Sequence, residues 1–130
     1  TPAMGGRNLR VLVVDDDERF RALVATLLES AGYEVVGTAS DGAEGVSLCE
    51  RLAPDAVTMD LEMPVLDGVA ATAAITEGPA APVVVIVSGS ASSEKLEDAL
   101  SSGAFAHVPK RRAPELLVET LERALAATRA

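Results

Sequence analysis

Aromatic residues, cysteine and histidine are scarce in this chain of 130 residues. Phe, Trp and Tyr make up only 2% of it, so aliphatic side chains must build the core. Cys49 is the only cysteine, which excludes an intrachain disulfide and is typical of a buried thiol in a reducing, intracellular setting. His107 is the only histidine, so a histidine-based metal site would need ligands that this chain lacks.

Positive charge and long apolar runs are also in short supply. Eleven Lys and Arg stand against twenty Asp and Glu, and the net charge of -9 argues against unaided binding to nucleic acid. The longest aliphatic run, residues 83–87, is far shorter than the roughly 20 residues of a membrane span. Residues 1–8 contain no apolar stretch of the kind found in signal peptides. We expect a cytoplasmic protein without membrane or nucleic-acid contacts.

The remaining composition is that of one globular domain. Hydrophobic residues make up 48% of the chain and charged residues 24%, and 130 residues suit a single core. We expect this domain to span residues 9–127. A segment at 1–8 that is disordered or foreign to the protein would precede it, and a short tail at 128–130 would follow. Two possibilities stay open, a natural end at residue 130 or an effector domain beyond it.

Five β-strands are predicted along the chain. Residues 9–14 and 83–87 are continuous β-branched and aliphatic runs, typical of central strands that are buried on both faces of a parallel sheet. Residues 34–39, 56–60 and 106–109 are shorter or more polar runs of the same kind. The second and last strands of the series suit the edges of the sheet.

Apolar residues recur with the helical period in the gaps between these strands. Residues 20–28 carry such a stripe, and Gly32 follows it as a helix stop. Asp17 and Glu18, just before the stripe, are typical of a helix cap. Further helices are predicted after Asp41 and before Pro54, from Gly68 to about Glu77 behind the cap Asp67, from Ser92 or Ser93 to Gly103, and from Pro114 through Leu125.

The alternation of strands and helices specifies a doubly wound α/β domain. Parallel neighbours need helical crossovers, and these crossovers are nearly always right-handed. A five-stranded parallel sheet in the order 2-1-3-4-5, flanked by five helices, is the economical arrangement. In such a sheet the functional crevice lies beyond the carboxyl ends of the strands, between strands 1 and 3.

Charged and hydroxyl side chains gather at these carboxyl ends. Asp15 and Asp16 follow strand 1 and Asp60 ends strand 3, so their carboxylates would repel one another unless they were neutralised. A divalent cation is the natural solution, and oxygen-only ligands favour Mg²⁺ or Mn²⁺. Ser88 follows strand 4 and Lys110 follows strand 5. Each residue alone has an ordinary structural explanation, but their joint placement favours a functional site.

Four segments of the chain resemble the receiver domain of bacterial two-component response regulators, including those of chemotaxis. They are VLVVDDDERFR (11–21), PDAVTMDLEMPVLDG (54–68), VVIVSGSA (84–91) and GAFAHVPK (103–110), which agree with the family in order and spacing over nearly the whole chain. The resemblance implies a flavodoxin-like fold with the strand order given above.

The resemblance also implies a reaction. Asp60 would accept a phosphoryl group from a histidine kinase, a phosphotransfer protein or a small acyl phosphate, acting as the nucleophile. Charge in such a transition state spreads over peripheral oxygens, so cations and positioning supply most of the catalysis. Ser88 would hydrogen-bond a phosphoryl oxygen. Lys110 would pair with the phosphoryl group or, in the resting state, with Asp60.

An Mg²⁺ site is implied in the same way. Asp16 would coordinate the ion directly, together with Asp60 and the backbone carbonyl of Glu62, while Asp15 would act mainly through a bound water. The chain would catalyse only its own phosphorylation and dephosphorylation, and it would not be an enzyme acting on other substrates.

In this family a hydroxyl on strand 4 and an aromatic residue on strand 5 report the phosphorylation. Ser88 stands at the first position, and His107 stands at the second, where Tyr or Phe is usual. We favour His107 as the gate over the alternative of a weak gate with Phe105 in the core. Lys110 is followed by Arg111 instead of the proline of many members, which predicts a different loop at this point.

The implied output surface is formed by the fourth helix, the fifth strand and the fifth helix. Pairing of two copies through this surface on phosphorylation is one hypothesis, and an ordinary solvated helix face is the alternative. Its charged residues are Lys95, Glu97, Asp98, Arg111, Arg112, Glu115, Glu119 and Glu122.

Three other functions compete with a phosphorylation-dependent switch. A metal-dependent phosphatase of the haloacid-dehalogenase type also has Asp-x-Asp after strand 1, but Arg19 stands where that class wants Thr or Val. A flavodoxin-like FMN carrier needs a phosphate loop rich in glycine and hydroxyl groups, which four consecutive acids do not provide. The third is a receiver-like scaffold that is never phosphorylated, and the complete acidic set argues against it.

Overall fold

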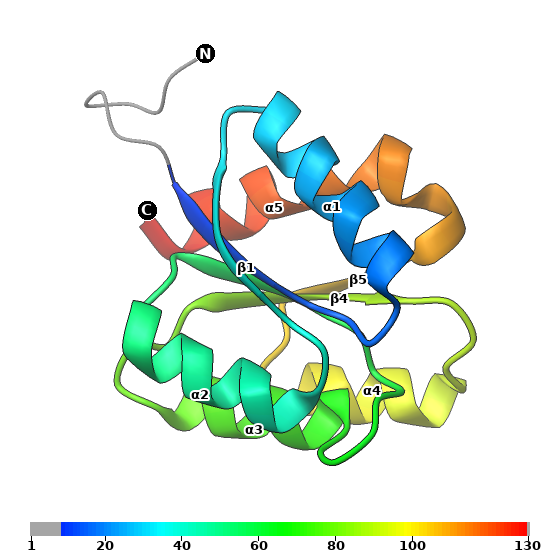
Figure 1. Ribbon diagram of the computed structural model, residues 1–130. Coiled ribbons are helices and arrows are strands. Elements are labelled where there is room, and N and C mark those ends of the chain that lie inside the picture. Colours follow the sequence, from blue (N-terminus) through cyan, green and yellow to red (C-terminus); the bar gives the residue numbers. More distant parts are fainter. Residues whose placement is uncertain (1–8, 130) are drawn as a thin grey trace.

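The computed structural model describes residues 9–129, in which five strands alternate with five helices (Figure 1). The expected segment at 1–8 lies outside the described residues. The elements are β1 (Arg10–Val14), α1 (Glu18–Ser30), β2 (Glu34–Ala39), α2 (Gly42–Leu52), β3 (Ala56–Met59), α3 (Gly68–Glu77), β4 (Val83–Ser88), α4 (Ser93–Ser101), β5 (Ala106–Pro109), the 3-10 turn η2 (Lys110–Arg112) and α5 (Ala113–Arg129). Each predicted strand and helix is therefore present, with ends that differ by a few residues.

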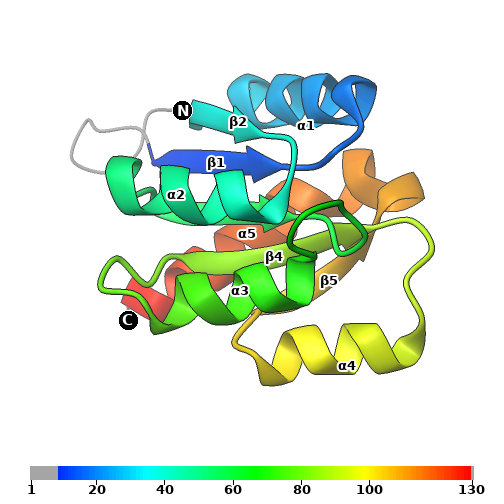
Figure 2. The ribbon, with the colours of Figure 1, turned by 60° about the horizontal axis from the view of Figure 1, so that its bottom comes forward.

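The strands form one parallel sheet in the order β2-β1-β3-β4-β5, which confirms the predicted topology. Helices α1 and α5 cover one face of this sheet, and α2, α3 and α4 cover the other (Figures 1 and 2). Among residues 9–129, no helix is both long enough and apolar enough to cross a membrane.

Aliphatic side chains of the central strands divide between two core clusters. In β1, Val11 and Val13 pack on the side of α1 and α5, while Leu12 and Val14 pack on the opposite side. All six residues of β4 are buried as well. Burying such a side chain contributes about 1.5–3 kcal/mol, so the continuous apolar runs hold both layers of helices against the sheet. Cys49 of α2 is buried in the second cluster, as expected.

Side-chain caps begin the helices where the sequence predicts them. The Asp17 carboxylate accepts hydrogen bonds from the backbone N–H groups of Arg19 and Phe20, which starts α1 directly after the acidic loop. The remaining caps are Asp41 for α2, Asp67 for α3 and Ser92 for α4.

Two features near the C-terminus bear on the expectations. The alternative that placed Phe105 in the core is wrong: its backbone N–H, just before β5, donates to the Val84 carbonyl, and its side chain is 44% exposed. Helix α5 continues through Arg129, so residues 128 and 129, which were expected in a tail, are helical. The loop expected after Lys110 is the 3-10 turn η2, which runs directly into α5.

Candidate functional site

The carboxyl ends of β1 and β3 place three carboxyl groups side by side. Val14 pairs with Met59 in the parallel register, and the Asp60 N–H donates to the Val14 carbonyl over 3.0 Å. Asp15 and Asp16 therefore follow one strand at the level where Asp60 follows its neighbour. The predicted convergence of these carboxyl groups is what the structure shows.

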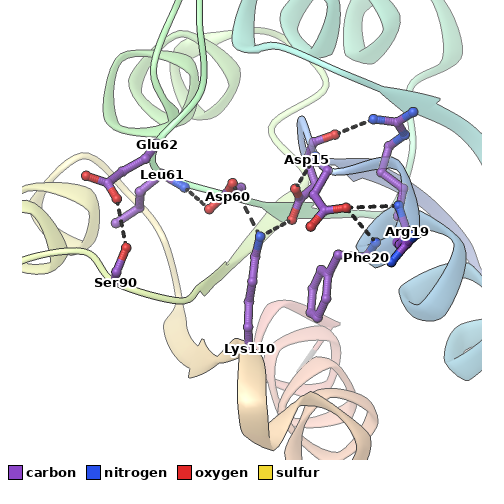
Figure 3. Close-up of polar contacts among 10 residues, drawn as sticks. Asp15, Arg19, Phe20, Asp60, Leu61, Glu62, Ser90 and Lys110 are labelled. Atoms are coloured by element: carbon purple, nitrogen blue, oxygen red, sulfur yellow. Dashed lines mark hydrogen bonds and ion pairs between the residues drawn. The ribbon is translucent and has the colours of Figure 1, made fainter.

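Asp60 is almost fully buried, with 5% of its surface exposed. One carboxylate oxygen accepts the backbone N–H of Leu61 over 2.8 Å (Figure 3). Burial raises the pKa of Asp60 to about 6, and the negative charge of Asp15 adds to this rise. The Lys110 ammonium and the Leu61 N–H act in the opposite direction. The free carboxylate is thus poorly solvated, which favours the approach of a cation or a change that removes its charge.

Lys110 lies between two of these carboxylates. Its Nζ is 2.9 Å from Asp15 Oδ2 and 3.6 Å from Asp60 Oδ2, so the closer partner is Asp15 and not Asp60, which the resemblance implied (Figure 3). Burial lowers the pKa of Lys110, but the hydrogen bond with Asp15 and the charge of Asp60 raise it by more. Lys110 is therefore protonated and can form an ion pair with either carboxylate.

The acidic cluster is suited to a divalent cation. One carboxylate oxygen each from Asp15, Asp16 and Asp60 can be chosen so that all three lie within 4.8 Å of one another. Asp15 and Asp60 are buried, whereas Asp16 is exposed and leaves one side open to water. An all-oxygen donor set with room for waters fits Mg²⁺ or Mn²⁺.

Ser88 ends β4, the strand next to β3, and His107 lies within β5, one strand beyond it. Ser88 is the last residue of β4, is 3% exposed, and pairs with Pro109 of β5. His107 is half-buried, and its ring makes a hydrogen bond with the backbone of Ser88. Burial lowers the pKa of His107, and this hydrogen bond partly offsets the change. The two predicted switch residues are thus in contact, while their roles stay predictions.

The Glu62 side chain turns away from Asp60 (Figure 3). Its carboxylate accepts a hydrogen bond from the Ser90 hydroxyl over 3.1 Å and pairs with Lys95 Nζ over 3.3 Å. These contacts join the loop after β3 to the start of α4. The predicted metal ligand is the backbone carbonyl of Glu62, a role that the side-chain contacts leave untested.

Two residues of α1 belong to the site although the sequence placed them only on a helix. The Phe20 ring lies under the Lys110 ammonium, with Nζ 4.6 Å from the ring centroid. The Arg21 guanidinium donates to the backbone carbonyl of Asp15 over 2.7 Å. The helical repeat of apolar residues predicts Phe20 as a core residue, and it does not predict the contact with Lys110. A basic residue one turn after an acidic strand end is the only hint of Arg21.

Gly68 allows the loop after β3 to fold back onto the site. Its N–H donates to the Leu61 carbonyl over 2.8 Å at the first turn of α3. A Cβ atom at this position would collide with the carbonyl oxygen of Asp60 and with Leu61 Cα. The Asp-Gly pair at 67–68 thus caps α3 and brings its first turn against Asp60.

Comparison with known proteins agrees with this geometry. A model of the response regulator receiver domain matches residues 11–122. The response regulator domain of CheB from Thermotoga maritima superposes with a TM-score of 0.85 at 32% identity, covering 92% of this chain and 98% of that one. A chain from a complex of CheX, CheY, BeF3 and Mg²⁺ of Borrelia burgdorferi superposes with a TM-score of 0.81 at 27% identity, covering 95% and 92%.

Curated relatives are longer than this chain. A protein-glutamate methylesterase/protein-glutamine glutaminase of Hahella chejuensis is 43% identical over 104 residues, which cover 78% of this chain and 27% of the relative. The transcriptional regulatory protein PdtaR of Mycobacterium tuberculosis is 38% identical over 116 residues, which cover 89% and 56%. The chain thus spans between about a quarter and just over half of the length of these relatives.

Proposed function

Because this chain belongs to the family of response regulator receiver domains, we propose that it is a signalling switch that is phosphorylated on Asp60. One observation carries the proposal. The buried carboxylate of Asp60 shares a sheet edge with two further carboxylates and with the ammonium of Lys110. A nucleophile, a set of cation ligands and a fixed positive charge are the groups that phosphoryl transfer to a carboxylate needs.

In the proposed reaction, a carboxylate oxygen of Asp60 attacks the phosphorus atom of a phosphohistidine or of a small acyl phosphate. The new O–P bond forms as the bond from phosphorus to the donor atom breaks, and the electron pair of that bond leaves with the donor. A phosphohistidine releases its imidazole, and acetyl phosphate releases acetate. The Lys110 ammonium, 3.6 Å from Asp60 Oδ2, stabilises the negative charge on the transferred group.

Asp15, Asp16, Asp60 and the backbone carbonyl of Glu62 would hold Mg²⁺, with Mn²⁺ as an alternative. The ion supplies positive charge that neutralises the phosphoryl oxygens and lets them approach the acidic cluster. The presence of Mg²⁺ and BeF3 with CheY in the Borrelia burgdorferi complex supports this assignment for a structural relative. The Arg21 bond to the Asp15 carbonyl keeps the first two carboxylates at the end of β1.

Readout of the phosphoryl group would pass through Ser88 and His107. The Ser88 hydroxyl would turn to bond a phosphoryl oxygen, and the His107 ring, which contacts the Ser88 backbone, would follow it inward. Such a movement alters the surface made of α4, β5 and α5. We infer that this surface controls a partner or an attached output domain, which the longer relatives favour. Pairing of two phosphorylated copies through it is part of the proposal.

The proposed partner upstream is a sensor histidine kinase or a phosphotransfer protein in the cytoplasm. The domain itself would act on no other substrate and would contact neither nucleic acid nor membrane. Of the competing functions, the unphosphorylated scaffold stays as the alternative. Neither a phosphatase nor a flavin carrier has a supporting observation once the family is shown.

Incubation with acetyl phosphate and Mg²⁺, followed by intact mass measurement, tests the proposal. We expect a gain of one phosphoryl group that disappears when EDTA is added first and in the Asp60→Asn variant. The matched control is Asp98→Asn, which removes an exposed carboxylate on α4 and leaves the gain intact. No gain in the wild-type protein with Mg²⁺ present would favour the scaffold.

A further inference from the structure

The ammonium group of Lys110 makes two kinds of contact in the site. Its Nζ pairs with Asp15 over 2.9 Å and with Asp60 over 3.6 Å. It also lies 4.6 Å from the centroid of the Phe20 ring, over the ring face. An aromatic face attracts a cation within roughly 6 Å, so this distance marks a cation–π contact. The carboxylates account for the charge of the site, but the ring has no part in the reaction described so far.

The Phe20 ring is held firmly where it meets the ammonium. It is partly buried and packs against the core cluster that contains Val24 of α1. Its backbone N–H donates to the Asp17 carboxylate over 3.3 Å, and the Asp17 N–H donates to Asp15 Oδ1 over 2.8 Å. One short turn therefore places both the ring and the carboxylate that Lys110 pairs with.

The Lys110 side chain, by contrast, is partly exposed to solvent. Lys110 begins the 3-10 turn after the edge strand β5, and 23% of its side chain is exposed. A lysine ammonium on four methylene groups keeps much conformational freedom and is strongly hydrated in the open. The ring of Phe20 lies against this side chain (Figure 3). It therefore limits both the conformational freedom and the hydration of the ammonium group.

We propose that Phe20 is a positioning residue for phosphoryl transfer, whose ring keeps the Lys110 ammonium among the carboxylates of the site. The ammonium can then shift from Asp15 toward a phosphoryl group on Asp60 without leaving for solvent. This inference rests on the proposed function. Phe20 touches no reacting atom and acts through Lys110. For holding the ammonium, the aromatic face of Phe20 matters more than the volume of its side chain. An aliphatic side chain of similar size offers no negative face to a cation.

The first test reads the contact directly, in the unphosphorylated and metal-free protein. The chain has two lysines, and Lys95 is exposed, so its side-chain NMR signals provide an internal reference for those of Lys110. The ring current of Phe20 should shift the Hε resonance of Lys110 upfield of that of Lys95. We expect this shift to vanish in Phe20→Leu and to persist in Phe20→Tyr.

The second test measures the rate of phosphorylation by acetyl phosphate with Mg²⁺. Phe20→Leu should slow the reaction about fivefold, as the loss of a cation–π contact at a partly exposed site predicts, and Phe20→Tyr should restore most of the rate. The matched control is Phe105→Leu, because Phe105 is the other phenylalanine of the chain and is 44% exposed. A second control, Leu27→Ala, weakens the packing of α1 against the same core and should leave the rate unchanged.

Two results would overturn the inference. An unchanged Lys110 resonance in Phe20→Leu would show that the ring does not hold the ammonium. A slow Phe20→Leu variant whose rate Phe20→Tyr fails to restore, or a Leu27→Ala variant that is equally slow, would assign the effect to packing of α1. If the wild-type protein gains no phosphoryl group, the proposed function fails, and Phe20 then has no transfer reaction to position, whatever the resonance shows.

Discussion

Asp60 is a buried carboxyl group whose surroundings favour its protonated form. Burial and the charge of Asp15 raise its pKa from 3.8 to about 6, even though Lys110 lies nearby. A raised pKa means that the protonated form is favoured in the folded state. The stability that it contributes is fully present below pH 3.8 and is lost as the pH rises through about 6. The proposed phosphoacceptor therefore destabilises the metal-free fold at neutral pH.

Asp60→Asn is expected to stabilise the metal-free protein at neutral pH. The pKa shift corresponds to about 2–3 kcal/mol of unfolding free energy, gained at pH 7.5 and largely absent at pH 4. Urea unfolding in EDTA at both values measures the difference between variant and wild type. Asp98→Asn, at an exposed position, should show no such pH dependence. Equal stability of Asp60→Asn and wild type at pH 7.5 would contradict the electrostatic description of the site.

Thr72→Val tests a second buried polar group, on the inner side of α3. Thr72 is fully buried, and its Oγ1 has no hydrogen-bond partner within residues 9–129. Replacing the hydroxyl by a methyl group should raise the unfolding free energy by about 1 kcal/mol. Thr72→Ser keeps the hydroxyl and loses the methyl group, so it should destabilise. A loss of stability in Thr72→Val would mean that the hydroxyl is satisfied in solution.

At the scale of the elements, short loops connect the helices to the carboxyl edge of the sheet. The loop between β3 and α3 folds back so that Gly68 touches the backbone of Asp60. The same loop contacts α2, because the Gly42 N–H donates to the Leu66 carbonyl over 3.0 Å. Through Glu62 it also contacts Ser90 and Lys95 near the start of α4. The loop between β3 and α3 thus connects Asp60 with α2, α3 and α4.

Gly68→Ala is expected to damage both the fold and the site. The new Cβ collides with the Asp60 carbonyl oxygen, which is backbone and cannot move aside without shifting Asp60, the proposed phosphoacceptor. We expect a loss of about 2 kcal/mol or more of unfolding free energy, together with slower phosphorylation. Gly78→Ala, at the other end of α3, meets its nearest atoms at 3.5 Å and should be nearly neutral. Similar stabilities for the two variants would argue against the close approach at Gly68.

The sequence predicts these elements well because each has a local cause. The apolar run of β4 fixes a strand that is buried on both faces, and Asp17, Asp67 and Ser92 cap helices as their residue types suggest. Phe105 had no such local cause: it lies just before the short edge strand β5, where few residues carry a pattern, so its 44% exposure could not be predicted from the sequence.

The sequence also predicts which residues gather in the site, but it does not predict which of them form ion pairs. Parallel strands bring their carboxyl ends together, which places Asp15, Asp60 and Lys110 at one edge. Which carboxylate Lys110 approaches more closely depends on side-chain conformation and burial, and no sequence pattern encodes that choice. The contact of Phe20 with Lys110 could not be predicted for the same reason, because the apolar stripe of α1 already accounts for a phenylalanine at this position.

At the scale of the whole molecule, charge is unevenly distributed. The chain has a net charge of -9, and its acids concentrate at the carboxyl edge of the sheet, where Lys110 is the nearest base. Farther along the chain, acids and bases form ion pairs at and along α5, Arg112–Glu115 and Arg123–Glu119. The site is therefore a local region of negative charge, which favours a divalent cation over an anion.

Mg²⁺ is expected to stabilise the whole fold through this region. An ion that binds only the folded state adds about 1.4 kcal/mol when its free concentration is about ten times the dissociation constant. Thermal unfolding with and without Mg²⁺ should show a higher midpoint with the ion. Asp16→Asn should remove most of this shift, and Asp98→Asn should keep it. A shift that survives in Asp16→Asn would place the ion elsewhere.

The central claim is that Asp60, among all the acids of this edge, forms the covalent bond to phosphorus. Borohydride reduces an aspartyl phosphate to homoserine, so treatment after incubation with acetyl phosphate and Mg²⁺ marks the acceptor permanently. Peptide mass spectrometry should find homoserine at position 60 and unmodified aspartate at positions 15 and 16. Homoserine at 15 or 16, or at no position while the wild-type protein is folded and bound to Mg²⁺, would contradict the account.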